Sequence, residues 1–529
     1  MASRRRWALI VGVLALAGCD ANRFVSGWIP YWNSTSGRAT IENSSAALLY
    51  SDVSPMWYGT AADGSIVATS STTTLATTVA AARAQGLPVI PAIFDGTATG
   101  VMSAILANPT SRANHIQKIV DLVVAKGYDG IDLDYEVFAF GNPRSEWATI
   151  TPNWISFVNA LSAQLHAKGK LLSVTIPPTW MTGTTSSGYS VYAQAEIAAA
   201  VDRLRLMVYD WSVFSPGPIG PISWINDVIS YSSSRVPVSK LQLGVPAYGR
   251  HWATQKSSAE VCPDGAIYRD SITMKAAPDL AASKGQTPLR HASGEMTFSW
   301  TERVTGPRTK TIPPPIIPIP PIGIPTIDLA ISNEGLQPAL RLGVITAPVT
   351  CTVQHTVYYP DAANIRQRAD AAAAANWSGI IIWALGYEVS DVYAQLAGVG
   401  PQRPNGSPTG AIDPIVGGPG TIRVTGFGYD PEFDLPASVT VTVTATAGGA
   451  AVSPRTVVAN VQRSNMPDGL GPFHGFDQTF SVAAGSYSVC VTLRLWDGTA
   501  GLALGCQAIA VAAAASPAFG DETISMVAR

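Results

Sequence analysis

The first 400 residues repeat one pattern, in which an amphipathic helix is followed by a glycine and then by an apolar segment of strand length. In one unit Gly86 follows a helical pattern at 72–85 and precedes the segment LPVIPAIF. In a later unit Gly169 follows a helical pattern at 154–168 and precedes LLSVTIPP. Apolar strands that alternate with helices form a parallel sheet with both faces covered. The pattern therefore predicts an α/β fold.

Eight candidate strands can be counted, at 25–32, 47–58, 87–94, 130–136, 171–178, 203–210, 241–249 and 379–385. Eight strand and helix units close into a (β/α)8 TIM barrel, whose active site lies at the C-terminal ends of the strands. We therefore expect a barrel domain at 23–400. A long segment at about 252–358 separates the seventh strand from the eighth and predicts an insertion there.

The fourth segment carries three acidic residues, Asp132, Asp134 and Glu136, at alternate positions among apolar ones. A strand sends alternate side chains to one face, so the three carboxyl groups are predicted to share a face, about 7 Å apart at the backbone. Carboxylates this close cannot all ionise freely, so at least one pKa must rise, and an acid that stays protonated near neutral pH can serve as a general acid. The alternative is a solvated strand face or a metal-binding loop, but the usual calcium-loop pattern is absent.

Four separate stretches resemble the signature motifs of glycoside hydrolase family 18, the chitinase-like family, in the family's order over roughly 24–400. The matching residues are Asp129, Gly130, Asp132, Asp134 and Glu136 for the DGxDxDxE motif; Met207, Tyr209 and Asp210 for the M-x-Y-D motif of the sixth strand; Gly244, Pro246, Tyr248, Gly249 and Arg250 for the seventh; and Trp383 for the eighth. The resemblance implies that the insertion is a small α+β domain forming one wall of the substrate groove.

The resemblance also implies substrate-assisted retaining hydrolysis, in which the 2-acetamido oxygen of the substrate attacks the anomeric carbon. Glu136 would protonate the leaving oxygen and then activate water as a base. Asp134 would bind the acetamido N–H and stabilise the oxazolinium ion. Asp132 would share a proton with Asp134, which keeps the row from carrying its full charge.

Four further residues are expected to bind the substrate. The resemblance implies that Tyr209 donates to the acetamido carbonyl, that Asp210 contacts the sugar and that Trp383 forms the floor under the reacting ring. Met207 belongs to the same motif as Tyr209. Ordinary core packing is the alternative for the two aromatic residues and for Met207, since methionine often fills gaps in a core.

The implied activity is hydrolysis of β-1,4-linked glycans that contain N-acetylglucosamine, either chitin-type oligomers or cell-wall glycan. Many chitinases have Trp-Glu-Tyr-Pro at the acid, whereas this chain has Tyr135, Glu136, Val137 and Phe138. That sequence is more similar to the bacterial wall-lytic and spore-associated branch. A carbohydrate-binding protein on an inactive barrel would normally lack the acid, and a purely structural envelope lipoprotein would neither bind nor cleave sugar.

The N-terminus has the features of an export signal. Three arginines at 4–6 precede an apolar run at 7–17, which is too short for a stable membrane-spanning helix and predicts a signal peptide at 1–18. The run Leu16-Ala17-Gly18-Cys19 resembles a bacterial lipobox. It implies that Cys19 carries a lipid and anchors an envelope lipoprotein to the outer face of the membrane. An ordinary signal peptide and a secreted protein are the alternative.

The four remaining cysteines form an even set in an exported chain, which favours disulfides over metal ligands. We expect Cys262–Cys351 within the insertion and Cys490–Cys506 between neighbouring strands. The sequence has no CxxC or HExxH pattern and its six histidines are scattered, so we expect no metal or other cofactor. A formal charge of −2 offers no basic surface for nucleic acid, and we expect a monomer.

Composition changes after residue 400. The segment 401–420 is rich in Pro and Gly and predicts a linker, whereas the alternating short segments at 421–514 predict an all-β sandwich followed by a tail at 515–529. The run 474–511 resembles a C-terminal module of secreted actinobacterial proteins, which we interpret as a spacer or wall-contact domain; a carbohydrate-binding module is the alternative. Within the insertion, the Pro-rich run 311–325 favours polyproline II and predicts an extended arm, with partner binding as the alternative.

Overall fold

The computed structural model of the chain describes residues 24–43, 46, 49–311, 344–399, 408–429, 437–447, 450, 452–459, 461–463, 473–494 and 500–513. They fall into two units, one built mainly from residues 25–401 and one from residues after 402. No helix among the described residues is long and apolar enough to cross a membrane. The expected signal peptide, Cys19, the Pro-rich run beyond Thr311 and the tail lie outside these residues.

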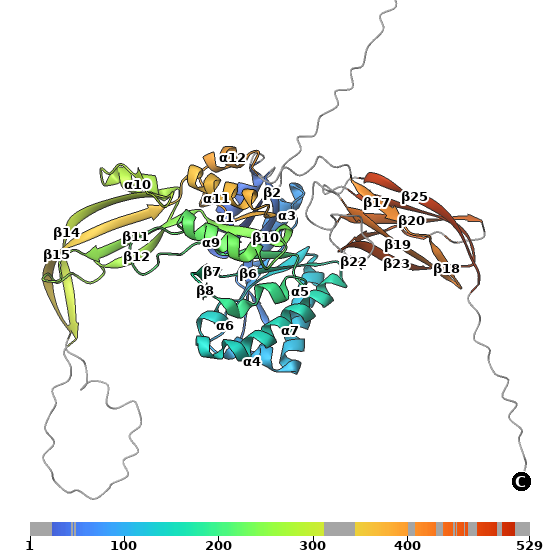
Figure 1. Cartoon of the computed structure of the whole chain (residues 1–529), viewed down its shortest axis with the longest axis horizontal. Helices are drawn as coiled ribbons and strands as arrows, with labels where there is room; N and C mark the ends of the chain where they lie inside the picture. Colours follow the sequence, from blue (N-terminus) through green and yellow to red (C-terminus); the bar gives the residue numbers. More distant parts are fainter. Residues whose placement is uncertain are drawn as a thin grey trace, which may run out of the picture. The chain divides into compact units, whose positions relative to one another are not determined.

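Eight parallel strands form a closed barrel in the first unit (Figure 1). They are β1 (Val25–Pro30), β2 (Tyr50–Thr60), β4 (Ala92–Phe94), β5 (Gly130–Asp134), β6 (Leu171–Ile176), β9 (Arg203–Leu206), β10 (Leu241–Pro246) and β16 (Gly379–Trp383). Their order is β1-β16-β10-β9-β6-β5-β4-β2, and pairing of β1 with β2 closes the ring. Each strand overlaps a segment that the sequence predicts, and β2 extends two residues beyond its segment, so the predicted TIM barrel is confirmed.

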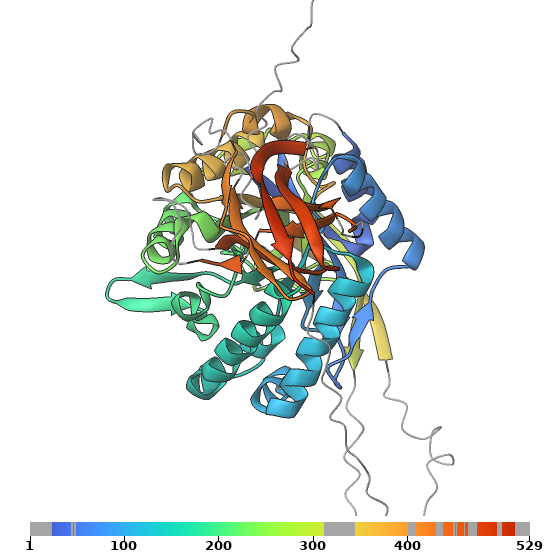
Figure 2. The same ribbon diagram turned by 90° about the vertical axis from the view of Figure 1, so that its right-hand side faces the viewer.

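Amphipathic helices stand outside the strands, as the blue and cyan helices of Figure 2 show. The main ones are α1 (Ser34–Glu42), α3 (Thr72–Ala84), α4 (Val101–Ala107), α5 (Pro109–Lys126), α7 (Trp147–His166), α9 (Ile222–Ser233), α11 (Ala362–Ala374) and α12 (Asp391–Leu396). In α5 the apolar residues Ile116, Ile119 and Val123 are buried. Gly127 then adopts φ +66°, a left-handed conformation that side chains disfavour, and ends the helix just before β5.

Shorter helices and strands lie near the ends of the barrel strands. They are the antiparallel strand β3 (Ile66–Ala68) beside β2, the hairpin of β7 (Thr179–Thr182) and β8 (Thr185–Gly188) after β6, and the short helices α6 (Val137–Phe140) and α8 (Gln194–Ile197). The hairpin and α6 follow C-terminal strand ends. They therefore lie on the side of the barrel where an active site is expected.

The insertion between β10 and β16 is an α+β domain, as expected. Its sheet has the order β12-β11-β15-β14-β13, built from β11 (Tyr248–Gln255), β12 (Tyr268–Thr273), β13 (Leu289–Arg290), β14 (Met296–Thr311) and β15 (Val344–Tyr359). Helix α10 (Ala276–Ser283) packs on this sheet through Ala277 and Ala281. The expected disulfide Cys262–Cys351 fastens the loop between β11 and β12 to β15, with Cα atoms 4.9 Å apart.

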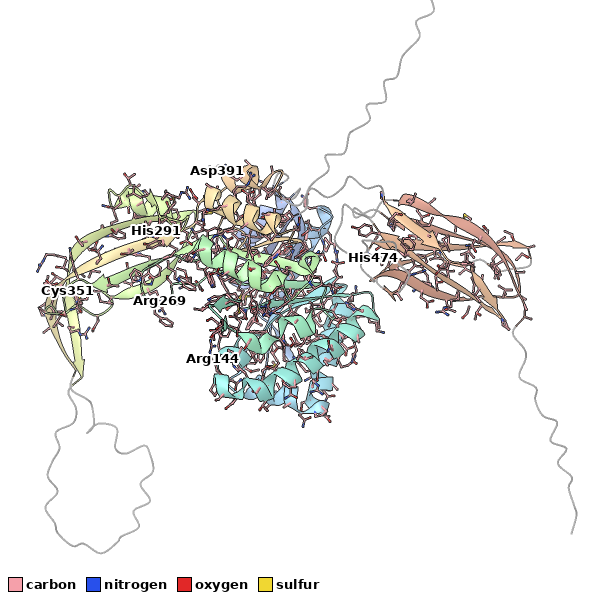
Figure 3. The ribbon with its side chains drawn as sticks, in the orientation of Figure 1. Arg144, Arg269, His291, Cys351, Asp391 and His474 are labelled. Atoms are coloured by element: carbon pink, nitrogen blue, oxygen red, sulfur yellow. A yellow bond between two sulfur atoms is a disulfide. The ribbon has the colours of Figure 1, made fainter. Side chains whose placement is uncertain are left out.

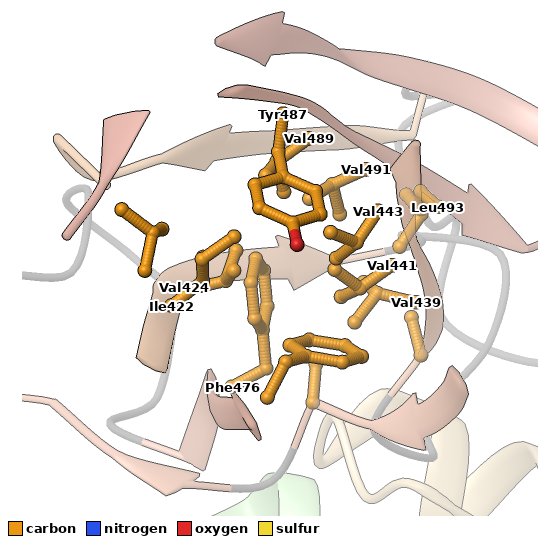
Figure 4. Packing of buried hydrophobic residues seen from close by; sticks show 14 residues of the cluster. Ile422, Val424, Val439, Val441, Val443, Phe476, Tyr487, Val489, Val491 and Leu493 are labelled. Carbon is orange, nitrogen blue, oxygen red and sulfur yellow. The ribbon is translucent and has the colours of Figure 1, made fainter. Parts of the chain in front are cut away.

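The second unit consists of two antiparallel sheets packed face to face. One contains β17 (Thr409–Ile412), β18 (Val416–Gly418), β19 (Thr421–Tyr429), β22 (Val461–Gln462) and β23 (Phe473–Ser481); the other contains β20 (Ser438–Ala447), β21 (Arg455–Val458), β24 (Gly485–Arg494) and β25 (Ala500–Val511). Figure 4 shows Ile422, Val424 and Phe476 of the first sheet meeting the valines of the second. The expected disulfide Cys490–Cys506 joins directly opposite residues of β24 and β25.

The prediction that 401–420 is only a linker is wrong for its second half. Residues 409–412 and 416–418 form β17 and β18, both paired with β19. The glycines that suggested flexibility are required by packing: a Cβ on Gly410 would come within 2.8 Å of Leu504, and one on Gly417 within 3.0 Å of Ile509. Composition alone cannot separate a glycine that loosens a chain from one that lets two strands approach.

Candidate active site

The carboxylate row begins inside the barrel and ends beyond it. Asp132 and Asp134 lie on β5, while Glu136 follows the strand and precedes α6 with a helical backbone conformation, φ −101° and ψ −39°. The prediction that all three lie on one strand face is therefore wrong for Glu136. The strand ends at Asp134, and the turn that follows it carries the third carboxyl group towards the groove.

The turn around Glu136 is held by buried side chains on both sides. Asp95, after β4, accepts the backbone N–H of Phe138 at 2.9 Å, and Tyr192 donates to the carbonyl of Tyr135 at 2.7 Å. His115 Nδ1 lies 2.8 Å from a backbone carbonyl and must donate there, so its Nε2 accepts the Tyr135 hydroxyl at 2.6 Å. Burial lowers the pKa of His115, which fits this neutral form. These contacts fix the backbone on either side of Glu136.

Asp132 lies at the centre of a polar network that fills the barrel interior. It is fully buried and accepts hydrogen bonds from Trp28, Ser54 and Thr175 over 3.0 to 3.1 Å. Arg205 of β9 donates to it over 2.9 Å and forms a buried ion pair. Arg205 and the indole N–H of Trp28 can act only as donors to Asp132. The expected sharing of a proton with Asp134 stays a prediction.

Arg205 also binds a second buried carboxylate, Asp52 of β2. Burial alone would raise the pKa of Asp52, but Arg205 and Arg203 offset this, and the pKa lies below its usual value. Gln242 of β10 accepts from Arg205 Nε over 2.9 Å and donates to Ser26 over the same distance. The interior therefore pairs two acids with two arginines beneath the catalytic end of the barrel.

Asp134 and Glu136 have a different environment from Asp132. Among the described residues, none donates a hydrogen bond to the buried Oδ1 of Asp134. Burial, followed by the neighbouring carboxylates of Glu136 and Asp132, raises the pKa of Asp134 well above its usual value. Burial and the nearby carboxylate of Asp210 raise the pKa of Glu136 to about 7. Glu136 can therefore hold a proton near neutral pH and release it at modest cost.

The opposite wall of the site comes from the end of β9 and from the insertion. Asp210 adopts φ +60°, a left-handed conformation that is uncommon outside glycine. Its carboxylate accepts the Tyr248 hydroxyl at 2.6 Å and pairs with Arg250 Nη2 at 2.7 Å. Tyr209 precedes it and is buried near Asp134 and Glu136; burial raises its pKa far above the usual value, so its hydroxyl stays protonated as a donor.

Two cavities share Asp210, and one of them is also lined by Glu136. The first, which we call the Trp383 cavity, measures about 350 Å³ and is lined by Trp383, Trp32, Tyr387 and residues of β11 and β12. The second, the Glu136 cavity, measures about 450 Å³ and is lined by Glu136, Met207, Tyr209 and a group of aromatic residues that includes Trp180, Trp211 and Trp224. All predicted substrate-binding residues therefore line one cavity or the other.

Several residues that line the two cavities were not predicted from the sequence. Trp32 and Tyr387 are joined by a hydrogen bond of 2.7 Å across 355 positions of sequence. Trp180 and Trp211 have ring centroids 5.8 Å apart, although one follows β6 and the other β9. The only signal in the sequence was their position just beyond a barrel strand. Among the described residues, no group of three His, Cys, Asp or Glu side chains could hold a metal ion.

Comparison with known proteins gives consistent matches. Residues 29–388 match the profile of the glycosyl hydrolases family 18. The protein named "Putative sporulation-specific glycosylase YdhD" of Bacillus subtilis is 31% identical over 165 residues, 30% of this chain and 36% of that protein. A class V chitinase of Arabidopsis thaliana is 28% identical over 199 residues, 33% of this chain and 50% of that protein. The match thus spans between about a third and half of these relatives' length.

A solved structure shows the same fold. The chitinase from Chromobacterium violaceum superposes with a TM-score of 0.52 at 19% identity, covering 71% of this chain and 98% of that one. At this level of identity the likeness concerns the fold alone.

Proposed function

Because this chain belongs to the glycosyl hydrolases of family 18, we propose that it hydrolyses β-1,4-linked glycans that contain N-acetylglucosamine. One observation carries the proposal. Glu136 lines a cavity of about 450 Å³, and its pKa is raised to about 7. Such an acid is poised to give and then take a proton near neutral pH.

The proposed mechanism is substrate-assisted and retaining. The 2-acetamido oxygen attacks the anomeric carbon while Glu136 gives its proton to the leaving glycosidic oxygen, and an oxazolinium ion forms. Water then attacks the same carbon, Glu136 takes its proton, and the acetamido group is restored. No carboxylate of the protein bonds to the sugar, so the carboxylate row needs only one proton donor.

The other site residues fit steps of this mechanism. The Oδ1 atom of Asp134, which lacks a donor among the described residues, is able to accept the acetamido N–H and to face the developing positive charge. The protonated hydroxyl of Tyr209 can donate to the acetamido carbonyl oxygen. Asp210 keeps a fixed carboxylate beside the sugar because Tyr248 and Arg250 hold it. Trp383 presents an aromatic surface for the reacting ring.

The substrate class has two candidates. A relative named as a sporulation-specific glycosylase favours cell-wall glycan, and a relative named as a chitinase favours chitin-type oligomers. A catalytically weak carbohydrate-binding lipoprotein is the alternative function. We propose further that the protein is exported and held at the outer face of the membrane by a lipid on Cys19. A Cys19→Ser variant should lose lipid labelling and leave the membrane fraction; retention there would contradict the anchor.

The direct test is hydrolysis of a fluorogenic N-acetylglucosamine oligomer and of both polymers. Glu136→Gln keeps the shape of the side chain but removes the proton donor, so turnover should fall by at least about 10² to 10⁴-fold while oligosaccharide binding persists. The matched control is Glu196→Gln on the exposed face of α8, which should keep wild-type turnover. Equal turnover by Glu136→Gln and the wild type would contradict the proposal.

A further inference from the structure

The loop 211–220, which follows Asp210, is held by the insertion near its start and at its end. At its start, the β11 side chains described above bind the Asp210 carboxylate. Near the start of the loop, the indole N–H of Trp252, also on β11, donates to the carbonyl of Val213 at 3.0 Å. This loop carries part of the wall of the Glu136 cavity. The insertion therefore contacts the catalytic groove through the loop as well as directly.

Glu295, in the turn between β13 and β14, holds the far end of the loop. Its Oε2 accepts the backbone N–H of Ile219 and its Oε1 that of Gly220, each at 2.7 Å. Arg368 of α11 donates to the same Oε1 at 2.6 Å and to the carbonyl of Gly220 at 3.0 Å. Both charged side chains are fully buried. The loss of any one partner would leave a buried charged or polar group unsatisfied, so this arrangement is rigid.

The turn that carries Glu295 lies on the barrel side of the insertion. Figure 3 shows His291, from the same turn, towards the barrel, and Cys351 towards the far part of the insertion. The backbone carbonyl of Ser293 accepts the N–H of Ile222 at the start of α9 over 3.3 Å. The turn is thus docked on the barrel beside the loop whose amides Glu295 binds.

The far end of the loop is connected to its start by one hydrogen bond. The backbone N–H of Trp211 donates to the carbonyl of Ile219 at 2.8 Å. Trp211 is the neighbour of Asp210, whose left-handed backbone needs support from its surroundings to persist. A displacement of Ile219 therefore reaches Asp210 through Trp211 without passing through the substrate groove.

We propose that Glu295 is a positioning residue, which fixes the 211–220 loop from the insertion and so keeps Asp210 beside Glu136 and Trp211 in the cavity wall. Glu295 itself lines neither cavity. The proposal rests on the proposed function, since it concerns the reaction of the same acid.

The effect should be visible in the pH dependence of hydrolysis. The titratable and charged groups around Glu136 are Asp134, Tyr192, Tyr209 and Asp210, with Tyr248 and Arg250 behind Asp210. After burial, Asp210 is the group that raises the pKa of Glu136. If the loop shifts and Asp210 moves away, that pKa falls. Glu136 must be protonated to begin the reaction, so the basic limb of the pH–rate profile moves to lower pH.

The test uses the full chain with Glu295→Gln. The expected results are a fall in kcat/KM of up to about 10²-fold, a basic limb at lower pH, and faster hydrogen exchange of the 211–220 amides. Glu295→Asp keeps the charge beside Arg368 but reaches less far, so it should change all three quantities in the same direction by less. If Glu295→Gln does not fold, the same measurements on Glu295→Asp still test the proposal.

Asp202→Asn provides a matched control. The Asp202 carboxylate accepts the N–H of Leu172 at 2.7 Å at the opposite end of the barrel strands, so the variant should lose stability and keep the wild-type pH profile. A folded Glu295 variant with an unchanged basic limb and unchanged exchange of the loop would overturn the proposal. If the wild type hydrolyses no N-acetylglucosamine polymer, the proposed function fails, and hydrogen exchange of the loop still decides whether Glu295 positions it.

Discussion

The barrel interior and the core of the sandwich differ in what they bury. Beneath the catalytic carboxyl groups the barrel buries two acids and two arginines, Asp52, Asp132, Arg203 and Arg205. The core of the sandwich is built from valines, isoleucine, leucine and aromatic residues. The hydroxyl of Tyr487 is the polar atom of that set, and it donates to a backbone carbonyl at 2.8 Å. The barrel thus bears a large cost of desolvating charged groups, whereas the sandwich does not.

The difference indicates what each interior is for. Buried ion pairs stabilise a fold little compared with apolar packing, because desolvation of the charges offsets their attraction. Beneath Asp134 and Glu136, these ion pairs hold Asp132 in place and bring positive charge close to the carboxylate row. In the barrel, stability and the catalytic site therefore depend on the same residues, whereas in the sandwich a change of stability should leave hydrolysis unaffected.

The largest effect is expected from Arg205→Met. The substitution leaves Asp52 and Asp132 buried without their main counter-charge, which should cost about 3–5 kcal/mol of unfolding free energy and abolish most hydrolysis. Denaturant unfolding and turnover of a fluorogenic oligomer measure both effects. The control is Arg423→Met, which removes an exposed ion pair with Asp477 in the sandwich and should change neither quantity much.

Equal stability of Arg205→Met and the wild type would contradict the importance of the charged interior. Retained hydrolysis in a destabilised but folded Arg205→Met variant would instead separate stability from the site. Either outcome would contradict the view that stability and catalysis depend on the same buried residues in the barrel but not in the sandwich.

A smaller effect, confined to the second unit, is expected from removing Cys490–Cys506 with a paired Cys→Ala change. The disulfide closes a loop of 16 residues, so its loss should destabilise the sandwich by about 3 kcal/mol by the chain-entropy estimate. Hydrogen exchange should increase in β24 and β25, while turnover of a short oligomer stays at the wild-type value. A fall in turnover would show that the two units are coupled.

The smallest effect concerns the pH dependence of stability. A carboxyl group whose pKa is raised on folding stabilises the fold while it is protonated, and this contribution is lost as pH rises through the folded pKa, which is about 7 for Glu136. Glu136→Gln cannot ionise and avoids that loss. Its melting temperature should exceed the wild-type value at about pH 8 and approach it at about pH 5. Glu196→Gln, on the surface, should show no such gain; an equal gain there would contradict the assignment.

The barrel could be predicted well from the sequence, because the spacing of apolar residues and the glycines that end helices mark where the strands lie. All eight strands follow from apolar runs bounded by glycines such as Gly127, and both disulfides follow from the number and placement of the cysteines. The acids on β5 follow from period-two alternation. The prediction failed where the strand stops, at Asp134, because the end of a strand depends on how its neighbours hold the turn, here through Asp95 and Tyr192.

Residues far apart in sequence that meet in space could not be predicted. Arg205 and Asp52 are separated by 153 positions, and nothing local marks either as part of a charged network. Glu295 lies in an ordinary turn, and its contacts with Ile219 and Gly220 follow from docking of the insertion. The strands β17 and β18 were hidden by a composition that is typical of linkers. In each case the missing information was a tertiary contact.

In the proposed mechanism, Glu136 acts together with the substrate's own acetamido group. The most direct measurement compares turnover of two matched fluorogenic oligomers, one with a 2-acetamido group and one with a 2-hydroxyl group at the cleaved sugar. We expect rapid hydrolysis of the first and none of the second, because no carboxylate of the protein serves as nucleophile. Comparable hydrolysis of the 2-hydroxyl substrate would contradict it.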